Sequence, residues 1–535
     1  MITITCYGGV GVIGGNKVLL EDGDSRLFFD FGTDFDARGR YFEEFLAPRA
    51  TVGLLDPLEM GLLPPLEGLY RPDLAPPDDI WSRFRDRPGH RRLSPVDGVL
   101  LSHAHLDHSG SVSFLHPSIP VYATAMSAFI AKAVQDCAGG GPEGEVVYWN
   151  ERQPGDDGLL GATASMPYQR RPFVLAGTGP LSPEAKQFWS ESPREKKVLL
   201  EAPLHVGLNR VGSLPVRHFP VDHSVYGACA WAVETSAGWV VYTGDLRVGV
   251  GARAADSERF IEEARALRPR ALVCEGTQLP LDEESPRGQV TEAQVREKAL
   301  QQVKAAGSGL VVADFGPRNI ERLLTFLEVS RATGRRLVVT TKDAYLVDAM
   351  RLVSSEVPDL ASEDAVAIYR DAKAHGGAWE ERLRQRHAPK LVGAKDVGAS
   401  PGDFVLCFSF WDLKNLVDIR PCGGRYIYSA SEAFSEEQMT DIDRLRNWLD
   451  HFGLSGVGLP LRERRGDRLT YRAEEPGLHA SGHASSADLL RLVHDVAPRT
   501  VIPVHTENPR YFVEALRGSG IEVLIPQYGV PIVLS

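Results

Sequence analysis

The sequence predicts an α/β protein in which one domain is interrupted by another. Its 535 residues are too many for one ordinary domain, because domains average about 150 residues. The chain up to about residue 285 has the pattern of short strands separated by turns, and the same pattern returns after about residue 470. Between these stretches, strands alternate with helices, which is the pattern of a parallel sheet.

The first part opens with three expected strands, Ile2 to Tyr7, Asn16 to Glu21 and Arg26 to Phe31. Between the first two lies a glycine-rich stretch, Gly9 to Gly14, whose spacing satisfies G-x-G-x-x-G. A dinucleotide-binding fingerprint needs a helix directly after these glycines, whereas Lys17 and the residues that follow read as a strand. We therefore interpret the glycines as a tight loop between two strands.

The rest of the first part combines further strands with two irregular insertions, residues 36–95 and 138–200. A helix is expected from Ser109 to His116. The remaining expected strands are Val99 to Ser102, Pro120 to Thr124, Leu214 to Pro220, Ala228 to Glu234 and Trp239 to Thr243.

The inserted part is predicted to form a parallel sheet covered by helices. Its first helix, 291–306, starts with Thr291 and Gln294 at the spacing of a capping box. The other expected helices are 319–333 and 435–452, and the expected strands are 309–314, 336–341, 404–408 and 426–429. A last strand, Thr500 to Val504, belongs to the returning first domain.

The net charge is −12, which argues against a protein that coats nucleic acid through broad positive potential. It does not exclude a nuclease, because bound metal ions supply positive charge to a phosphate. Local basic clusters could contact a polynucleotide backbone, although solvated surface charge is the commoner role of such clusters. These clusters are Arg170 with Arg171, Arg318 with Arg322, Arg335 with Arg336, and Arg462, Arg464, Arg465 and Arg468.

The six cysteines are scattered without a Cys-x-x-Cys pair, which favours a reducing compartment and neither disulfides nor a thiolate metal site. No segment approaches the roughly 18 to 20 apolar residues of a membrane helix. The first residues read as a strand and lack the features of a signal peptide. We expect a cytoplasmic protein with no membrane partner.

The strongest chemical signal is His-x-His-x-Asp-His at His103 to His108, directly after a hydrophobic strand. Imidazole nitrogens and carboxylate oxygens bind divalent metals. Residues two apart on an extended segment point the same way, so His103 and His105 can share one metal. Asp107 and His108 can reach a second as the chain turns into a helix. Histidines on a polar surface loop are the alternative, and three of the fifteen histidines within six residues argue against it.

Four residues do not complete two metal sites, so distant ligands are required. The best candidates stand at strand ends: His223, Asp245 in Thr-Gly-Asp, and His505. A lone histidine at such a position is more often structural. Asp245 could bridge two metals through its carboxylate.

In this order, the motifs resemble the metallo-β-lactamase superfamily. Three further stretches resemble its β-CASP nuclease branch, and ribonuclease J most of all. Gly8 to Asn16 is similar to the N-terminal loop of that family, Cys274 to Thr277 to the acidic β-CASP motif A, and His479 to Ala484 to a His-x-Ser-Gly-His stretch. Val12 replaces the usual Glu, and the chain stops soon after His505, without the additional C-terminal domain of many bacterial members.

The resemblance implies an αββα metallo-β-lactamase sandwich interrupted by an α/β β-CASP domain. The sandwich would comprise residues 1–283 and 470–535, and the β-CASP domain residues 284–469.

The resemblance also implies two divalent ions, Zn²⁺ or Mn²⁺ with Mg²⁺ as a further candidate. His103, His105 and His223 would hold one, Asp107, His108 and His505 the other, and Asp245 both. Asp30 would orient the ligands from outside the coordination sphere.

The resemblance further implies hydrolysis of RNA by a two-metal-activated hydroxide. Asp107, Glu275, His483 and Asp30 would be the catalytic set. Glu275 and His483 would stand beside the leaving group, with His483 as general acid or phosphate contact. The expected substrate contacts are His479, Ser481, Gly482, His483, Arg318, Ser429 and Ser431.

Three alternatives remain open from the sequence. A DNA nuclease of the same superfamily would use the same chemistry, so single-stranded DNA is the second candidate substrate after RNA. A small-ester hydrolase would not need residues 284–469 or the motifs at Glu275 and His483. A catalytically silent nucleic-acid-binding scaffold would be expected to have lost metal ligands. Exonuclease or endonuclease mode and a homodimer are also left open.

Overall fold

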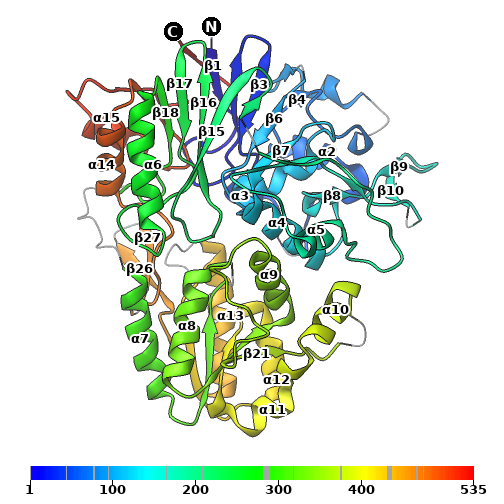
Figure 1. Cartoon of the computed structure of the whole chain (residues 1–535), viewed down its shortest axis with the longest axis vertical. Helices are drawn as coiled ribbons and strands as arrows, with labels where there is room; N and C mark the ends of the chain where they lie inside the picture. The colour runs from blue at the N-terminus through cyan, green and yellow to red at the C-terminus, as the bar shows by residue number, and fades with distance from the viewer. Residues whose placement is uncertain are drawn as a thin grey trace. The chain divides into compact units, whose positions relative to one another are not determined.

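A computed structural model describes the chain except residues 1, 44, 76–78, 94, 164, 208, 281–289, 317, 374–375, 431–435, 466–467 and 474. The chain forms two compact units, residues 1–287 with 482–535, and residues 288–481 (Figure 1). The second unit therefore continues past residue 469 and includes the start of the expected His479 to Ala484 stretch. Each unit is described by itself.

The first sheet of the first unit joins an antiparallel half to a parallel half. In the antiparallel half, β30 pairs with β1, β1 with β2, and β2 with β3. In the parallel half, β3 pairs with β6, β6 with β7, β7 with β12, and β12 with β13. The strands in sheet order are β13 (Leu204–Val206), β12 (Phe173–Ala176), β7 (Val121–Thr124), β6 (Gly98–Leu100), β3 (Ser25–Phe29), β2 (Val18–Asp22), β1 (Ile2–Cys6) and β30 (Pro531–Leu534).

The second sheet also changes direction midway. β14 to β17 are antiparallel, whereas β17, β18, β28 and β29 are parallel. The strands in order are β14 (Arg210–Val211), β15 (Leu214–Pro220), β16 (Cys229–Thr235), β17 (Gly238–Tyr242), β18 (Ala271–Cys274), β28 (Thr500–Pro503) and β29 (Glu522–Val523). The C-terminal segment thus completes both sheets, since β28 pairs with β18 and β30 with β1.

The two sheets face each other across a shared hydrophobic core. Ile4, Leu20 and Phe29 of the first sheet belong to the same buried cluster as Trp231 and Val273 of the second. Helices α6 (Ala254–Leu267), α14 (Ser486–Val496) and α15 (Arg510–Ala515) supply the second cluster on the other face of the second sheet. Helix α4 (Ala125–Cys137) packs against β7 and β12. The α/β sandwich expected from the sequence is confirmed.

The expected elements near the histidine cluster differ in one respect. In place of a helix from Ser109 to His116, the structure has α3 (Leu106–Ser109) followed by a 3-10 helix, Gly110–Phe114. Helix α3 therefore starts inside the cluster and includes Asp107 and His108.

The stretch 138–200 is more regular than expected, because β12 extends the main sheet. The remaining elements of the first unit are short: α1 (Phe35–Gly39), α2 (Leu55–Glu59), β4 (Leu66–Glu67), β5 (Arg91–Arg92), β8 (Tyr148–Trp149), β9 (Arg152–Pro154), β10 (Leu160–Ala162), β11 (Gln169–Arg170) and α5 (Pro183–Ser190).

The second unit contains a parallel seven-stranded sheet, as the alternation of strands and helices predicts. In sheet order its strands are β22 (Leu391–Val392), β21 (Val366–Tyr369), β20 (Arg336–Thr340), β23 (Phe404–Cys407), β19 (Leu310–Asp314), β24 (Gly424–Tyr428) and β25 (Leu454–Val457). A hairpin, β26 (Pro460–Arg465) and β27 (Arg468–Ala473), follows.

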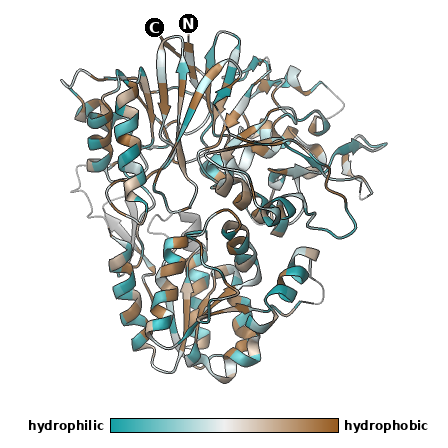
Figure 2. Cartoon of the chain, viewed as in Figure 1, coloured by the Kyte–Doolittle hydropathy of each residue, from teal (hydrophilic) through white to brown (hydrophobic). Residues whose placement is uncertain are grey.

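Several helices of the second unit contact strands of this sheet, and Figure 2 shows both hydrophilic and hydrophobic residues along the helices. They are α7 (Glu292–Ala305), α8 (Ile320–Ala332), α9 (Thr341–Arg351), α10 (Ala378–Arg386), α11 (Ala394–Ala399), α12 (Leu416–Ile419) and α13 (Glu436–Phe452). The capping box expected at Thr291 and Gln294 is present at the start of α7.

Three arginines of the expected basic clusters are buried inside their own units. Arg171 donates to the carbonyl groups of Leu115 and His116, and Arg335 donates to those of Gly309 and Phe404. Arg322 pairs with Glu292 at 2.8 Å. Because the donors of these three arginines are used inside the fold, their role is structural. The fourth expected cluster has side chains outside the described residues, namely those of Arg462, Arg464, Arg465 and Arg468. Over the described part of the chain, no helix is long and apolar enough to cross a membrane.

Candidate metal centre

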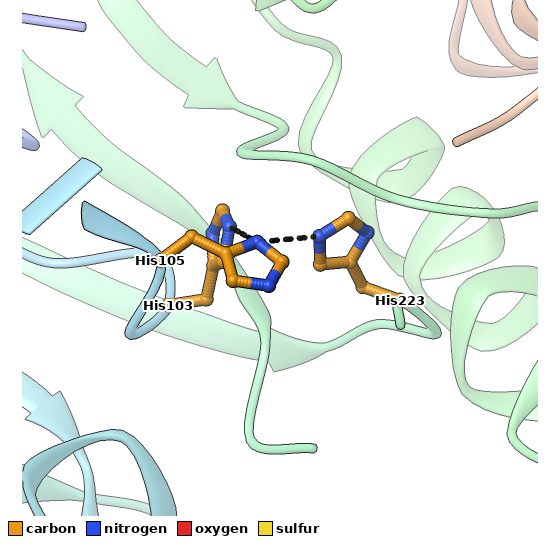
Figure 3. Close-up of side chains that lie close together, drawn as sticks. All are labelled: His103, His105 and His223. Carbon is orange, nitrogen blue, oxygen red and sulfur yellow. Dashed lines mark hydrogen bonds between the residues drawn. The ribbon is translucent and has the colours of Figure 1, made fainter. Parts of the chain in front are cut away.

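Three imidazole nitrogens converge in the first unit. His103 and His105 follow β6, and His223 follows β15. Nδ1 of His105 lies 3.0 Å from Nε2 of His103 and 3.3 Å from Nε2 of His223 (Figure 3). The sequence spacing thus brings the two neighbouring histidines together with one more than a hundred residues away.

A second group of four ligand atoms lies beside the first and consists of Asp107, His108, Asp245 and His505. Nε2 of His108 is 3.1 Å from Oδ2 of Asp245, and Nε2 of His505 is 3.2 Å from Oδ2 of Asp107. Asp245 also reaches the first group, since its Oδ2 lies 3.8 Å from Nε2 of His103. All seven residues expected to be ligands are therefore gathered at one place.

These residues fit a pair of divalent metal ions. Two ligands at about 2.1 Å from a tetrahedral ion stand about 3.4 Å apart, which is close to the separations of the three imidazole nitrogens. Oδ1 of Asp245 is buried and has no hydrogen-bond partner among the described residues, and a buried unpaired carboxylate oxygen is costly unless a cation satisfies it. The donors are imidazoles and carboxylates, the set that suits zinc and related ions.

Four of the histidines are oriented by a contact to Nδ1, the ring nitrogen that is not directed at the other ligands. Nδ1 of His103 lies 3.0 Å from Oγ of Ser102, and Nδ1 of His223 lies 2.6 Å from the carbonyl oxygen of Gly482. Nδ1 of His505 lies 2.8 Å from Oγ1 of Thr277. A contact on one nitrogen selects the tautomer that presents the other nitrogen to a metal.

The fourth histidine, His108, depends on the buried carboxylate of Asp30. Oδ2 of Asp30 lies 2.7 Å from Nδ1 of His108 and accepts a hydrogen bond of 2.7 Å from Oγ of Ser102. Oδ1 accepts one of 2.6 Å from the Ser102 backbone NH. Asp30 has φ 54, a backbone conformation that costs a non-glycine residue energy. The hydrogen bonds offset that cost and fix the carboxylate against the ligand.

Sequence reasoning missed Tyr242, Ser102 and Thr277 as members of this site. The hydroxyl of Tyr242 donates to Asp30 (2.7 Å) and accepts from the amide of Asn16 (2.9 Å). Burial, reinforced by Asp30, raises the pKa of Tyr242 well above its usual value, so the hydroxyl stays protonated and donates. The signals were weak, because each is one polar residue next to a recognised motif.

Glu275 and His483 form a pair at the edge of the centre. Oε2 of Glu275 lies 3.0 Å from Nδ1 of His483 and accepts a hydrogen bond of 2.6 Å from Thr277. Its Oε1 accepts from the Leu246 backbone NH at 2.8 Å. The side chain of Glu275 is only 1% exposed, whereas that of His483 is 22% exposed. Glu275 is therefore placed to orient His483, which is the member open to solvent.

Burial and neighbouring charges together set the protonation of the site. Burial, together with the neighbouring rings of His108 and His223, holds the pKa of His103 well below its usual value. Burial acts against the charged form of Asp245, yet His108 and His505 keep its pKa well below the usual range. Burial lowers the pKa of His483, but the carboxylates of Glu275, Asp245 and Asp107 together outweigh it and raise the pKa to about 9. The neutral, metal-binding form of His103 is thus favoured. In the second group, Asp245, Asp107 and Asp30 outweigh burial and raise the pKa of His108, so a metal would have to displace its proton.

Glycines let the surrounding loops approach the ligands closely. A Cβ on Gly32 would lie 1.6 Å from the carbonyl oxygen of Asp107, and one on Gly14, at φ +88, would meet the Asp107 side chain at 3.0 Å. The glycine-rich loop therefore packs on the histidine cluster, and β2 follows it. This agrees with the tight-loop interpretation.

The expected substrate contacts are divided between the two units. Gly482 and His483 belong to the first unit, and His479 and Ser481 to the second. Arg318 is half-buried beside the start of α8, and Ser431 lies outside the described residues. Ser429 is buried, and its hydroxyl donates to the carbonyl of Leu478 and accepts from Arg322. A structural role accounts for Ser429, and we do not retain it as a substrate contact.

Comparison with known proteins supports this description. Residues 473–526 match the family of the zinc-dependent metallo-hydrolase RNA specificity domain. The chain is 20% identical to ribonuclease J of Mycolicibacterium smegmatis over 94% of its own length and 68% of that protein. It is 24% identical to ribonuclease J of Sinorhizobium meliloti over 77% of the chain and 58% of that protein.

Among solved structures, a protein of unknown function from Enterococcus faecalis has the same fold. Its TM-score is 0.64 at 21% identity, and the match covers 100% of both chains. These comparisons confirm the resemblance that the motifs predicted: the chain is similar to ribonuclease J along most of its length, and residues 473–526 match the metallo-hydrolase RNA specificity domain.

Proposed function

We propose that this protein is a metal-dependent ribonuclease that hydrolyses phosphodiester bonds at the centre described above. The observation that carries the proposal is Asp245, whose carboxylate lies beside both ligand groups and has a buried oxygen that accepts no hydrogen bond from the described residues. The matched RNA specificity domain supports RNA as the substrate.

Each ligand group would hold one divalent ion. His103, His105 and His223 would hold the first, Asp107, His108 and His505 the second, and Asp245 would contact both. Two such ions would polarise the phosphoryl group and lower the pKa of a bound water. Asp30, Ser102 and Thr277 would keep the imidazoles oriented toward the ions.

We assign His483 the role of general acid. Its ring is partly exposed, and the contact with Glu275 favours the protonated imidazolium. An imidazolium next to the ligand cluster can donate a proton to the departing oxygen, which contributes about 10²- to 10⁴-fold to a rate. Glu275, being buried, would act through His483 and would not touch the substrate.

The test is digestion of RNA and single-stranded DNA of one sequence, with Mn²⁺, Mg²⁺ or Zn²⁺. RNAs with 5′-monophosphate, 5′-triphosphate and 5′-hydroxyl ends would report, through their product ladders, the mode and polarity of cleavage. We expect metal-dependent hydrolysis of RNA that Asp245→Asn abolishes and His116→Ala leaves unchanged, since His116 lies outside both ligand groups. Cleavage of DNA alone would replace the proposal with a DNA nuclease, and no cleavage with any metal would overturn it.

A further inference from the structure

A pocket of about 620 Å³ lies in the second unit, between α12 and the end of α13. This volume suits a small molecule of a few hundred cubic ångströms. None of the residues around it belongs to the ligand groups of the metal centre. They are Val417, Arg420, Asn447, Trp448, His451 and Phe452.

Aromatic rings form much of the wall. The rings of Trp448 and Phe452 are nearly parallel, at 21° with centroids 6.1 Å apart, and His451 meets Phe452 edge-on at 4.8 Å. Beneath them, Leu449 and Ile419 are buried in the core of the unit. The core therefore holds the backbone of both helix ends, while the rings are left partly exposed.

Polar groups stand among these rings without partners. Within the described part of the chain, no hydrogen bond or ion pair involves the side chain of Asn447 or Arg420, or the indole NH of Trp448. An amide offers both donors and an acceptor to the edge of a planar heterocycle. A guanidinium offers a charged fork that suits a phosphate.

Arg420 stands in a costly conformation for an arginine. It ends α12 at φ 54 and ψ 57, in the left-handed region, with its backbone NH bonded to the Leu416 carbonyl. Glycine is the usual residue at such a helix end. Arg268 and Ala497 end α6 and α14 in the same conformation, so this geometry places Arg420 beside the pocket and is itself a common helix end.

The pocket lies at the amino end of the parallel sheet of this unit. Helix α12 leads into the start of β24, and α13 leads into the start of β25. Asp314 ends β19 and Ser429 follows β24, so both lie at the opposite, carboxyl end of the same sheet. The pocket is thus a separate feature of the second unit.

We propose that this pocket binds a nucleotide, with the base against the rings of Trp448 and Phe452 and the phosphate at Arg420. Asn447 would contact the edge of the base. Stacking of a base on an aromatic side chain tolerates any sequence, because every base has a flat face. The nucleotide could be free or part of a single RNA strand, and this inference goes beyond the proposed hydrolysis.

The experiment measures binding of 5′-AMP to the metal-loaded protein by titration calorimetry, beside adenosine and ribose 5-phosphate. AMP has no phosphodiester bond, so the result does not depend on the proposed hydrolysis. We expect AMP to bind more tightly than either fragment, and Trp448→Ala to weaken it about fivefold or more. Anisotropy of a fluorescent oligoadenylate with phosphorothioate linkages separates the two sources. If the oligoadenylate binds the pocket more tightly than AMP does, the natural ligand is an RNA strand. If it binds more weakly than AMP, the natural ligand is a free nucleotide.

Two control variants test whether binding depends on this pocket. Trp411→Ala removes a tryptophan of the same unit that is 63% exposed and does not line the pocket, and it should not alter binding. Arg420→Gly should weaken AMP but not adenosine, and it should not lower the unfolding midpoint, because glycine accepts the positive φ. Absence of AMP binding at millimolar concentration, or binding that Trp448→Ala and Arg420→Gly leave intact, would overturn the proposal.

Discussion

Nδ1 of His108 lies 2.7 Å from Oδ2 of Asp30, and neither side chain is exposed to solvent. This contact turns Nε2 of His108 toward Asp245, so a residue that would touch no metal decides how a ligand is presented. Carboxylates that support ligating histidines in this way commonly determine both the orientation and the basicity of the ring. The predictions below test this support and the groups around it.

Asp30→Asn is expected to weaken metal binding about 10- to 100-fold. The amide keeps the size of the side chain but loses the charge that stabilises the ring of His108. Competition with a zinc chelator measures the change directly. Asp24→Asn, an exposed aspartate in the turn between β2 and β3, is the control, and equal affinity in the two variants would contradict the prediction.

His483→Ala is expected to leave both metals bound and to lower kcat on RNA about 10²- to 10⁴-fold, because the proton for the departing oxygen is lost. Metal content by mass spectrometry and single-turnover rates are the measurements. Glu275→Gln should lower the rate less, since the imidazole remains. Wild-type turnover in the alanine variant, or loss of metal from it, would remove His483 from the proposed role.

Tyr242→Phe is expected to destabilise the first unit by about 1–3 kcal/mol and to leave the metal content unchanged. The substitution leaves the buried amide of Asn16 without its acceptor, which carries a desolvation cost, while Asp30 retains Ser102 and His108. Urea unfolding measures the difference. Tyr122→Phe is the control, because the described residues offer its hydroxyl no hydrogen bond, and an equal loss there would contradict the prediction.

Removal of the metals is expected to loosen the centre alone. Ions that bind only the folded state stabilise it by about 2.7 kcal/mol at a hundredfold excess over Kd, and without them the crowded ligands repel or must be protonated. Hydrogen exchange should therefore accelerate with a chelator in the peptide that contains 99–110 and stay constant around β19 of the second unit. Unchanged exchange in the first peptide would argue against bound metal.

Stability is expected to fall as pH rises through 7 because of Asp314. Burial raises the pKa of this carboxyl to about 7, against the hydrogen bond from Tyr426 that lowers it. A raised pKa means that the stabilising protonated form is fully present below the unfolded pKa near 4 and is lost as pH passes through 7. Between pH 5 and pH 8 the loss is roughly 2–3 kcal/mol.

Asp314→Asn keeps the acceptor for Tyr426 and should remove this part of the pH dependence. Urea unfolding at pH 5 and pH 8 gives the comparison, with Asp450→Asn on the exposed side of α13 as the control. Identical pH slopes for wild type and Asp314→Asn would show that this carboxyl does not contribute.

Local patterns in the sequence determined much of the fold. The strand expected at Leu214 to Pro220 has the same bounds in β15, and the capping box of Thr291 starts α7 as expected. The histidine cluster could be recognised for a similar reason, because His103, His105 and His108 are neighbours in the chain. Hydrophobic periodicity and helix caps act over a few residues, so a sequence window contains their cause.

Only the tertiary structure decided which residues support the ligands from outside the centre. The hydroxyl of Tyr242 contacts Asp30, which is 212 positions away in the sequence, and that of Thr277 contacts His505, 228 positions away. The residues next to Tyr242 and Thr277 in the sequence do not indicate these partners. The sequence also did not predict the role of Arg322. Its charge favours a position on the surface, but its guanidinium donates to partners inside the second unit. Hydrogen bonds of this kind arise when sheets bring remote strand ends together, and their free energy depends on burial that no local window contains.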